Sequence, residues 1–418
     1  MKKIVIIGGG FAGINLAKSL SGNKNFEITI VDKNNYHFFP PLIYQVATAF
    51  IEVSNICYPF RRMMQEKDNL YFHYGEFEEI DTARKTIHTD TGSLQYDIAV
   101  LALGTETNFF GMENVEKNAY PMKTIDDALI LRNHLLENLE RTSKLSNREN
   151  ITKYQNVVIA GGGATGVEIA GMIAQMGEKL LRKDYPEITD NLGGIYLINA
   201  GESLLAPMSG KSQQEALQQL QNLNVKVLLK TSVKDYKDDK VTLSTGDIIP
   251  AATLLWTSGV IGRKVPGIPL QSVGRGRRII VDEYNRVVDA EDVYALGDIC
   301  LQTSDPAYPS GHPQVAQVAI QQAKQLSENL VRWTENQKGQ PFVYKNNGSM
   351  AIISKRNAVV DLPKNGFLKG FVAWLVWLFI HIIAMVGFGN KMKLAYNWFW
   401  SFITDNPALR LIIRKSGR

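Results

Sequence analysis

The pattern GxGxxG occurs twice in this chain of 418 residues, and the repeat constrains the fold more than any other feature. Each copy stands between a short apolar run typical of a buried strand, 4–7 or 157–160, and a helical stretch. Glycines there allow a tight turn and close approach of the backbone to a pyrophosphate, and the helix N-terminus adds positive partial charge. The copies are offset by 153 positions, which predicts an α/β fold with two Rossmann-like dinucleotide-binding domains. The glycines are Gly8, Gly10 and Gly13 in the first copy and Gly161, Gly163 and Gly166 in the second.

The residue that ends the next strand differs between the two copies. Asp32 ends it in the first copy, 19 residues after Gly13, where a carboxylate accepts hydrogen bonds from ribose hydroxyls. Asn199 takes this place in the second copy, and the nearest acid is Glu202. An amide hydrogen-bonds a ribose but does not repel a 2′-phosphate. The sequence therefore leaves the choice between NADH and NADPH open at the second site.

The C-terminal 53 residues, 366–418, carry an unusual mixture of charge and tryptophan. They contain seven Lys or Arg residues against one acid, Asp405, and four of the six tryptophans. Their 18-residue run 371–388 has His381 as its only ionisable residue. Basic residues beside tryptophan and a long apolar run are typical of a membrane surface, whereas a nucleic-acid site has no need of that run. We therefore expect membrane contact and no nucleic acid.

The apolar run is too short to settle by length whether it crosses the membrane. As one helix it would extend ~27 Å, against a hydrocarbon core of about 30 Å. Crossing would also carry the basic residues after it to the outer side, against the positive-inside tendency. We therefore predict a helix that lies flat in the interface, a monotopic attachment. A buried core or dimer helix without lipid contact is the alternative.

The cysteine content excludes several classes of protein. Cys57 and Cys300 are the only cysteines, 243 positions apart, and no CxxC occurs. A disulfide framework and a zinc or cluster site are therefore unsupported, and we expect no metal. Only four apolar residues, 4–7, precede Gly8, too few for a signal peptide, so we expect the chain to stay in the cytoplasm.

Further strings connect the chain with known flavoproteins. ALGT at 102–105, WTSG at 256–259 and LGD at 296–298 end apolar runs. With the two glycine loops, they make the chain resemble the two-dinucleotide flavoprotein reductases. Within that superfamily the resemblance is to type II NADH dehydrogenase, the single-subunit NADH:quinone oxidoreductase that does not pump protons, and it runs essentially from end to end. The strings that carry it are NYHFFPPLIYQVAT (35–48), ATGVEIAG (164–171), AQVAIQ (316–321) and the tryptophan-rich tail.

This resemblance implies that FAD binds the first glycine copy and NADH the second. It places Asp298, in the late Gly-Asp pair, at the ribityl and phosphate region of FAD. The polar segment 141–155 lacks apolar periodicity and is expected to connect domains before the second copy. The expected domains are 1–118 with 288–340 for FAD, 119–287 for NAD(P)H, and 341–418 for short strands and amphipathic membrane-anchoring helices.

The resemblance also assigns residues to the reaction. Glu168 is the carboxylate that the family places near nicotinamide, flavin and quinone; its alternative reading is a favourable charge near a helix N-terminus. Gln317 and Gln321, four residues apart, would share one helix face and donate to a quinone carbonyl, or form an ordinary polar face. Thr48 and Gln45 are expected beside the flavin ring.

Three other functions stay open for a reduced flavin. Disulfide reductases need two closely spaced cysteines, and sulfide:quinone reductases use several. A non-catalytic NADH-sensing flavoprotein of the apoptosis-inducing-factor kind would bind the same cofactors without rapid turnover. The favoured reading is a peripheral enzyme on the cytoplasmic side of the cell inner membrane. The sequence decides neither the quinone nor whether the chain forms a homodimer.

Overall fold

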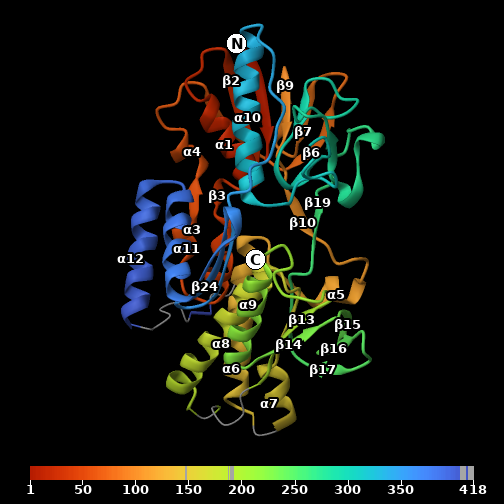
Figure 1. Ribbon diagram of the computed structural model, residues 1–418. Helices are drawn as coiled ribbons and strands as arrows, with labels where there is room; N and C mark the ends of the chain where they lie inside the picture. The colour runs from red at the N-terminus through yellow and green to blue at the C-terminus, as the bar shows by residue number, and fades with distance from the viewer. Residues whose placement is uncertain (146–147, 187, 189–192, 405–410, 413–418) are drawn as a thin grey trace. The chain divides into compact units, whose positions relative to one another are not determined.

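The computed structural model describes residues 1–145, 148–186, 188, 193–404 and 411–412 (Figure 1). Packing divides the chain into two compact units, each assembled from separate stretches of sequence. The first unit comprises 1–38, 57–106 and 260–346, and the second comprises 39–56, 107–259 and 347–418.

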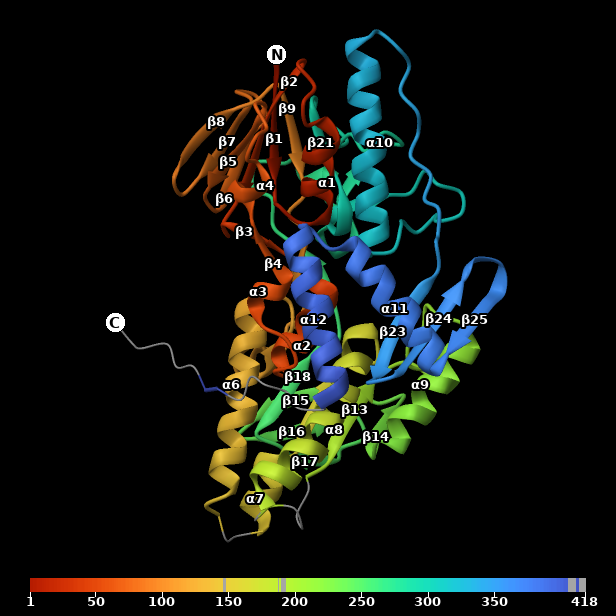
Figure 2. The same cartoon turned by 90° about the vertical axis from the view of Figure 1, so that its left-hand side faces the viewer.

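A five-stranded parallel sheet organises the first unit, with the order β21-β9-β1-β2-β5. Its strands alternate their side chains between two cores. Ile4 and Ile6 pack under the helices, whereas Val5 and Ile7 pack under the antiparallel sheet β6-β7-β8 (Figure 2). The strands and helices are β1 (Lys2–Ile7), β2 (Phe26–Asp32), β5 (Leu70–Tyr74), β6 (Phe77–Asp81), β7 (Thr86–Thr89), β8 (Gly92–Gln95), β9 (Ile98–Leu101), β21 (Val293–Ala295), α1 (Phe11–Leu20) and α10 (Ala316–Thr334).

The second unit repeats this plan, which confirms the predicted α/β fold with two Rossmann-like sheets. Its parallel sheet has the order β11-β18-β12-β13-β14, and the antiparallel sheet β15-β16-β17 shares a core with it. Its elements are β11 (Tyr120–Pro121), β12 (Val157–Ala160), β13 (Ile195–Asn199), β14 (Val225–Leu229), β15 (Val233–Lys237), β16 (Lys240–Leu243), β17 (Ile248–Pro250), β18 (Thr253–Trp256), α5 (Glu113–Asn118), α6 (Ile125–Thr142), α7 (Arg148–Gln155), α8 (Ala164–Asp184) and α9 (Gly210–Asn222).

The packing differs from the expected domain boundaries at 39–56, 107–118, 260–287 and 341–346, and it gives the polar segment 141–155 a different role. Residues 260–287 pack in the first unit because β20 (Ile279–Val281) pairs with β22 (Cys300–Gln302) there. Residues 39–56, between β3 (Tyr36–Phe38) and β4 (Cys57–Pro59), form α2 (Ile43–Ala47) and α3 (Val53–Ile56) in the second unit. The polar segment 141–155 is not a connection between the units: α6 ends in it and α7 forms most of it, both inside the second unit.

The C-terminal part of the second unit is a three-stranded antiparallel sheet followed by two helices. The strands are β23 (Ser349–Ser354), β24 (Asn357–Leu362) and β25 (Gly366–Lys369). The apolar run is not one helix, because α11 (Gly370–Ala384) ends where Met385 is extended and Gly387 has φ +84°, and α12 (Phe388–Thr404) starts anew. Among the described residues no helix is both long and apolar enough to cross a bilayer.

Candidate functional site

The first glycine loop joins β1 to α1 and is shaped by close backbone contacts. Gly8 has φ +106°, and a Cβ there would overlap the carbonyl of Ala102. A Cβ on Gly13 would overlap the carbonyl of Gly8, so the helix can approach the strand only without a side chain. Gly10 caps α1 with no side-chain bond and with open space around its Cβ position. The loop thus leaves room for a phosphate at the helix N-terminus.

Asp32 closes this loop from the end of β2. Its Oδ2 accepts a hydrogen bond from Gly9 N at 2.7 Å, and its Oδ1 accepts one from Asn34 N at 2.8 Å. Burial raises the pKa of Asp32, and the two backbone hydrogen bonds oppose that rise. The expected position of Asp32 beside the loop is therefore found.

The second glycine loop has the same construction. Gly161 has φ +113°, and its Cβ would overlap the carbonyl of Thr257; a Cβ on Gly166 would overlap the carbonyl of Gly161. Asn199 Oδ1 accepts a hydrogen bond from Gly162 N at 3.1 Å, the role that Asp32 has in the first loop. Its Nδ2 donates to Ser203 O at 2.9 Å, so this amide is turned toward the loop that follows β13. Gly163, like Gly10, has open space around its Cβ position.

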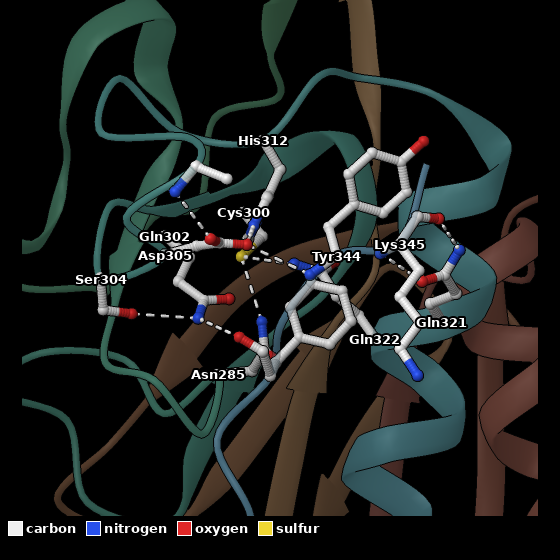
Figure 3. Close-up of polar contacts among 12 residues, drawn as sticks. Asn285, Cys300, Gln302, Ser304, Asp305, His312, Gln321, Gln322, Tyr344 and Lys345 are labelled. Carbon is white, nitrogen blue, oxygen red and sulfur yellow. Dashed lines mark hydrogen bonds and ion pairs between the residues drawn. The ribbon is translucent and has the colours of Figure 1, made fainter. Parts of the chain in front are cut away.

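Asp298 lies in a short turn of the first unit that three side chains hold. Thr105 Oγ1 donates to Asp298 Oδ2 at 3.4 Å, which joins the ALGT and LGD strings. Gln314 Nε2 donates to Asp298 O at 2.9 Å, and Gln322 Oε1 accepts from Gly297 N at 2.8 Å. Figure 3 shows Gln322 reaching from α10 toward Cys300, the residue after this turn. The turn that carries Asp298 is thus fixed by amide side chains on both sides.

Gln317 and Gln321 lie one turn apart on α10, as predicted, but Gln321 is committed to the backbone. Its Nε2 donates to Lys345 O at 2.8 Å and its Oε1 accepts from Lys345 N at 3.0 Å (Figure 3). These two hydrogen bonds hold the backbone of Lys345 against α10. To bind a quinone carbonyl, the Gln321 amide would have to break its hydrogen bonds to Lys345. The side chains of Gln317 and Gln321 are both half-buried.

Glu168 is buried in the second unit, on α8, with only 9% of its surface exposed. Ile352 N of β23 donates a hydrogen bond to Oε1 of Glu168 at 3.4 Å. Burial raises the pKa of Glu168 to about 8, and the bond from Ile352 opposes that rise. Tyr44 of α2 is close enough that burial, and then the charge of Glu168, raises the pKa of the tyrosine. Glu168 therefore carries a proton at neutral pH.

A pocket opens beside Glu168 within the same unit. Met172, one turn along α8 from Glu168, and Ile352, its hydrogen-bond donor, are both in the wall. Three tryptophans of α11 and α12 are among the seven other lining residues. The pocket thus combines an apolar aromatic wall with a nearby protonated carboxyl, features typical of sites for planar organic ligands. Its lining is Gln45, Phe50, Met172, Ile352, Lys355, Trp374, Trp377, Leu378 and Trp398.

Gln45 and Thr48, expected beside the flavin ring, have other contacts in the second unit. Gln45 Oε1 accepts a hydrogen bond from Trp398 Nε1 at 2.8 Å, which ties α2 to α12. Thr48 Oγ1 donates to Tyr44 O at 2.8 Å, within its own helix. The sequence analysis assigned the tail tryptophans to the membrane surface, whereas Trp374, Trp377 and Trp398 line this pocket. Ile352 and Tyr44 were given no role, because pocket walls from elements so far apart in the chain leave no local pattern.

The two cysteines have no features of a redox pair. Neither forms a disulfide in the described part of the chain. Burial raises the pKa of Cys57 to about 12 and that of Cys300 to about 11, so both thiols stay protonated at neutral pH.

Comparison with known proteins identifies relatives along the whole chain. A family model described as pyridine nucleotide-disulphide oxidoreductase matches residues 2–323, and the NDH2 C-terminal domain matches 346–405. The type II NADH:quinone oxidoreductase Ndh of Mycobacterium tuberculosis is 31% identical, over 96% of this chain and 88% of its own. NdhA of the same organism is 32% identical, over 96% of this chain and 87% of its own.

Solved structures share the fold. NDH2 from Plasmodium falciparum, in complex with NADH, superposes with a TM-score of 0.89 at 23% identity, over 99% of this chain and 100% of that one. The sulfide:quinone oxidoreductase of Aquifex aeolicus gives a TM-score of 0.72 at 19% identity, over 98% of this chain and 93% of that one.

Proposed function

Because the chain belongs to the type II NADH:quinone oxidoreductases, within the pyridine nucleotide-disulphide oxidoreductases, we propose that it oxidises NADH and reduces a membrane quinone by two electrons, without pumping protons. The observation that carries the proposal is the pocket in the second unit, which has tryptophans in its wall and whose lining residue Ile352 donates to the buried carboxyl of Glu168. The family relationship and the pocket agree on an apolar planar acceptor.

FAD is proposed to bind the first glycine loop. Bound FAD supplies the two-electron carrier between nicotinamide and quinone. The loop fits this cofactor, because Gly10 leaves the start of α1 open to a phosphate and Asp32 stands at the end of β2 to accept from ribose hydroxyls. Asp298 is proposed at the ribityl and phosphate region, on its fixed turn, and Thr48 near the ring.

NADH is proposed to bind the second glycine loop. Gly161, Gly163 and Gly166 form the phosphate cradle, and Asn199 contacts the ribose. Because Asn199 carries no charge, we propose that NADPH is also accepted. Lys230 lies at the same edge of the sheet, where its Nζ pairs with Glu202 at 2.8 Å.

Glu168 is proposed as the proton donor to the quinone. A carboxyl with a pKa of about 8 is protonated before turnover, and it can release its proton as the acceptor gains negative charge. Ile352 N then stabilises the carboxylate through its hydrogen bond to Oε1. Gln317 is proposed as the quinone contact on α10. For Gln321 the same role requires exchange of its bonds to Lys345.

The C-terminal helices are proposed to dock on the membrane surface, on the cytoplasmic side of the inner membrane. α11 divides into two faces: Trp374, Trp377 and His381 are buried, while the other face is exposed. Lysines 391 and 393 flank the exposed apolar residues, as at an anionic membrane surface. The exposed residues are Phe371, Val372, Leu375, Phe379, Ile380 and Ile383 on α11, and Met392, Tyr396, Phe399 and Trp400 on α12.

Vesicle binding tests this docking. The full chain should sediment with vesicles of anionic lipid, and replacing Phe379 and Ile383 by Ser should release it. If a second copy covers this face instead, the same double variant becomes monomeric while vesicle binding stays unchanged.

Anaerobic mixing tests the function. The purified yellow protein is mixed with NADH and then with a short-chain quinone while flavin absorbance is followed. We expect bleaching by NADH and rapid recovery with quinone. A long-lived reduced complex that quinone does not reoxidise would support the NADH-sensing alternative and refute the proposed reductase.

A further inference from the structure

One peptide group in the first glycine loop is held by side chains on both sides of Gly9. Asp32 Oδ2 accepts from Gly9 N at 2.7 Å, and Gly9 O lies 3.0 Å from Nδ1 of His37 in β3. A carbonyl oxygen only accepts, so Nδ1 of His37 must carry the proton. His37 is the third residue of the string NYHFFPPLIYQVAT (35–48).

His37 is a neutral ring in a closed environment. It is 4% exposed, and its edge packs against Phe11 with ring centroids 5.7 Å apart. Burial lowers the pKa of His37 to about 4; the bond to Gly9 opposes that change and the charge of Lys18 adds to it. The imidazole therefore keeps one proton across the physiological range.

The bond to Gly9 is also the only hydrogen bond of this ring within the described residues. Nε2 is buried and has no protein partner there. Burial of a nitrogen without a hydrogen-bond partner carries a cost in stability. A phenylalanine would fill a similar volume without that cost, so packing alone does not account for a histidine at this place.

In the second loop a backbone donor, and not a side chain, holds the equivalent carbonyl. Gly162 N donates to Asn199 Oδ1 at 3.1 Å, and Gly162 O accepts from the backbone N of Leu205 at 2.8 Å. Gly162 and Gly9 are equivalent, each following the first glycine of its loop. Both loops thus fix both sides of the same residue, and His37 replaces a backbone donor in the first.

A planar trans peptide makes this contact significant for phosphate binding. The carbonyl of Gly9 and the N–H of Gly10 belong to one peptide plane and point in opposite directions. A donor that holds Gly9 O on one side therefore aims the Gly10 N–H at the other side, toward the open N-terminus of α1. Two adjacent glycines would otherwise rotate freely, and ordering them costs entropy on binding.

We propose that His37 is a positioning residue for the first phosphate loop: its Nδ1–H fixes the Gly9–Gly10 peptide so that the loop is ordered before the pyrophosphate of FAD arrives. The inference rests on the proposed binding of FAD at this loop. It assigns His37 no contact with the cofactor and no part in electron transfer.

Three substitutions separate the donor from the ring. Asn places an amide N–H near the position of Nδ1, Gln extends to the position of Nε2, and Phe keeps only the volume. FAD affinity of the apoprotein is measured by fluorescence quenching. We expect His37→Phe and His37→Gln to weaken FAD binding about tenfold, the effect of one hydrogen bond, and His37→Asn to restore most of it. NADH affinity should stay unchanged in all three.

The outcomes distinguish this inference from the proposed function. If the wild-type apoprotein binds no FAD, the proposed cofactor site is wrong. If wild type binds FAD and His37→Phe binds it equally well, or if Asn, Gln and Phe weaken it equally, His37 has only a packing role. Should the variants fail to fold, nitrogen NMR of the wild-type histidines decides: a proton on Nε2 of His37 contradicts the inference.

Discussion

The two glycine loops of this protein have the same backbone and different side chains around it. Gly8 and Gly161 share positive φ values of 106° and 113°, and in both loops the last glycine fits under the carbonyl of the first. The residue that closes the loop is a carboxylate in one and an amide in the other, Asp32 against Asn199. The shared part is what a pyrophosphate requires, so the differences indicate what distinguishes the two ligands.

The helices after the loops differ more. Two residues beyond the last glycine, α1 has Asn15, whose Nδ2 donates to Phe11 O of its own helix at 2.7 Å. α8 has Glu168 at that place, buried and with a raised pKa. Since α1 folds with a half-buried amide there, the fold itself needs no carboxylate. A buried carboxyl is unfavourable for folding, so its presence agrees with the role in proton transfer that we propose for Glu168.

The largest expected effect comes from replacing the first glycine of either loop, which the two loops share. Gly8→Val should yield protein without flavin, whereas Gly161→Val should yield yellow protein whose KM for NADH rises at least about 100-fold, because each side chain would enter the backbone of the neighbouring strand connection. Absorbance after purification and steady-state kinetics measure the two effects. Loss of flavin from the Gly161 variant would contradict the assignment of the loops.

Gly10→Ala and Gly163→Ala are the matched controls. A Cβ at either position meets no protein atom within 4 Å, so unfolding midpoints should stay near that of wild type. Binding of the respective dinucleotide should still weaken, since the methyl group lies where the phosphate approaches.

The second largest effect concerns Glu168. Glu168→Gln removes the proton donor but keeps the shape, so quinone reduction should slow about 100-fold while NADH still reduces the flavin at the wild-type rate. In the wild type the rate of quinone reduction should fall as pH rises through about 8, because the carboxyl of Glu168 loses its proton there. The variant should show no such fall. Asn15→Ala, at the equivalent place of α1, should leave both half-reactions unchanged.

The third prediction exchanges the residues that close the loops. Asn199→Asp should lower the kcat/KM for NADPH about tenfold relative to NADH, since a carboxylate repels a 2′-phosphate. Asp32→Asn should weaken FAD binding about tenfold by removing the charged acceptor. Equal activity of the Asn199 variant with both nucleotides would show that this position does not select the cofactor.

The sequence predicted the two repeated glycine loops and their sheets, but it did not predict the pocket or all of the unit boundaries. Glycine spacing and apolar runs predicted both parallel sheets, because these signals are local. The pocket beside Glu168 was not predicted, since its walls come from α2, α8, β23, α11 and α12. The placement of 260–287 in the first unit was missed for the same reason: a pairing between β20 and β22 leaves no local pattern.

Two errors have a definite physical cause. The polar composition of 141–155 suggested a connection, but α7 packs against α6 within the second unit. The run 371–388 suggested one helix because His381 is its only ionisable residue, yet Gly387 with its positive φ interrupts it. Composition could not show the packing of 141–155 or the break in 371–388, because the first depends on packing partners and the second on the backbone of a single residue.

The smallest expected effect is a difference in acid sensitivity between the loops. Burial raises the pKa of Asp32, so this carboxylate becomes protonated at a higher pH than an ordinary aspartate, and FAD affinity should begin to fall correspondingly early on acidification. Asn199 has no proton to gain, so the direct binding of NADH should stay flat over the same range. Titration of both ligands between about pH 4 and 7 measures the difference, with Asp32→Asn as control, since its weaker FAD affinity should no longer depend on pH. Parallel acid profiles for both ligands in the wild type would mean that the two loops differ in shape alone and not in charge.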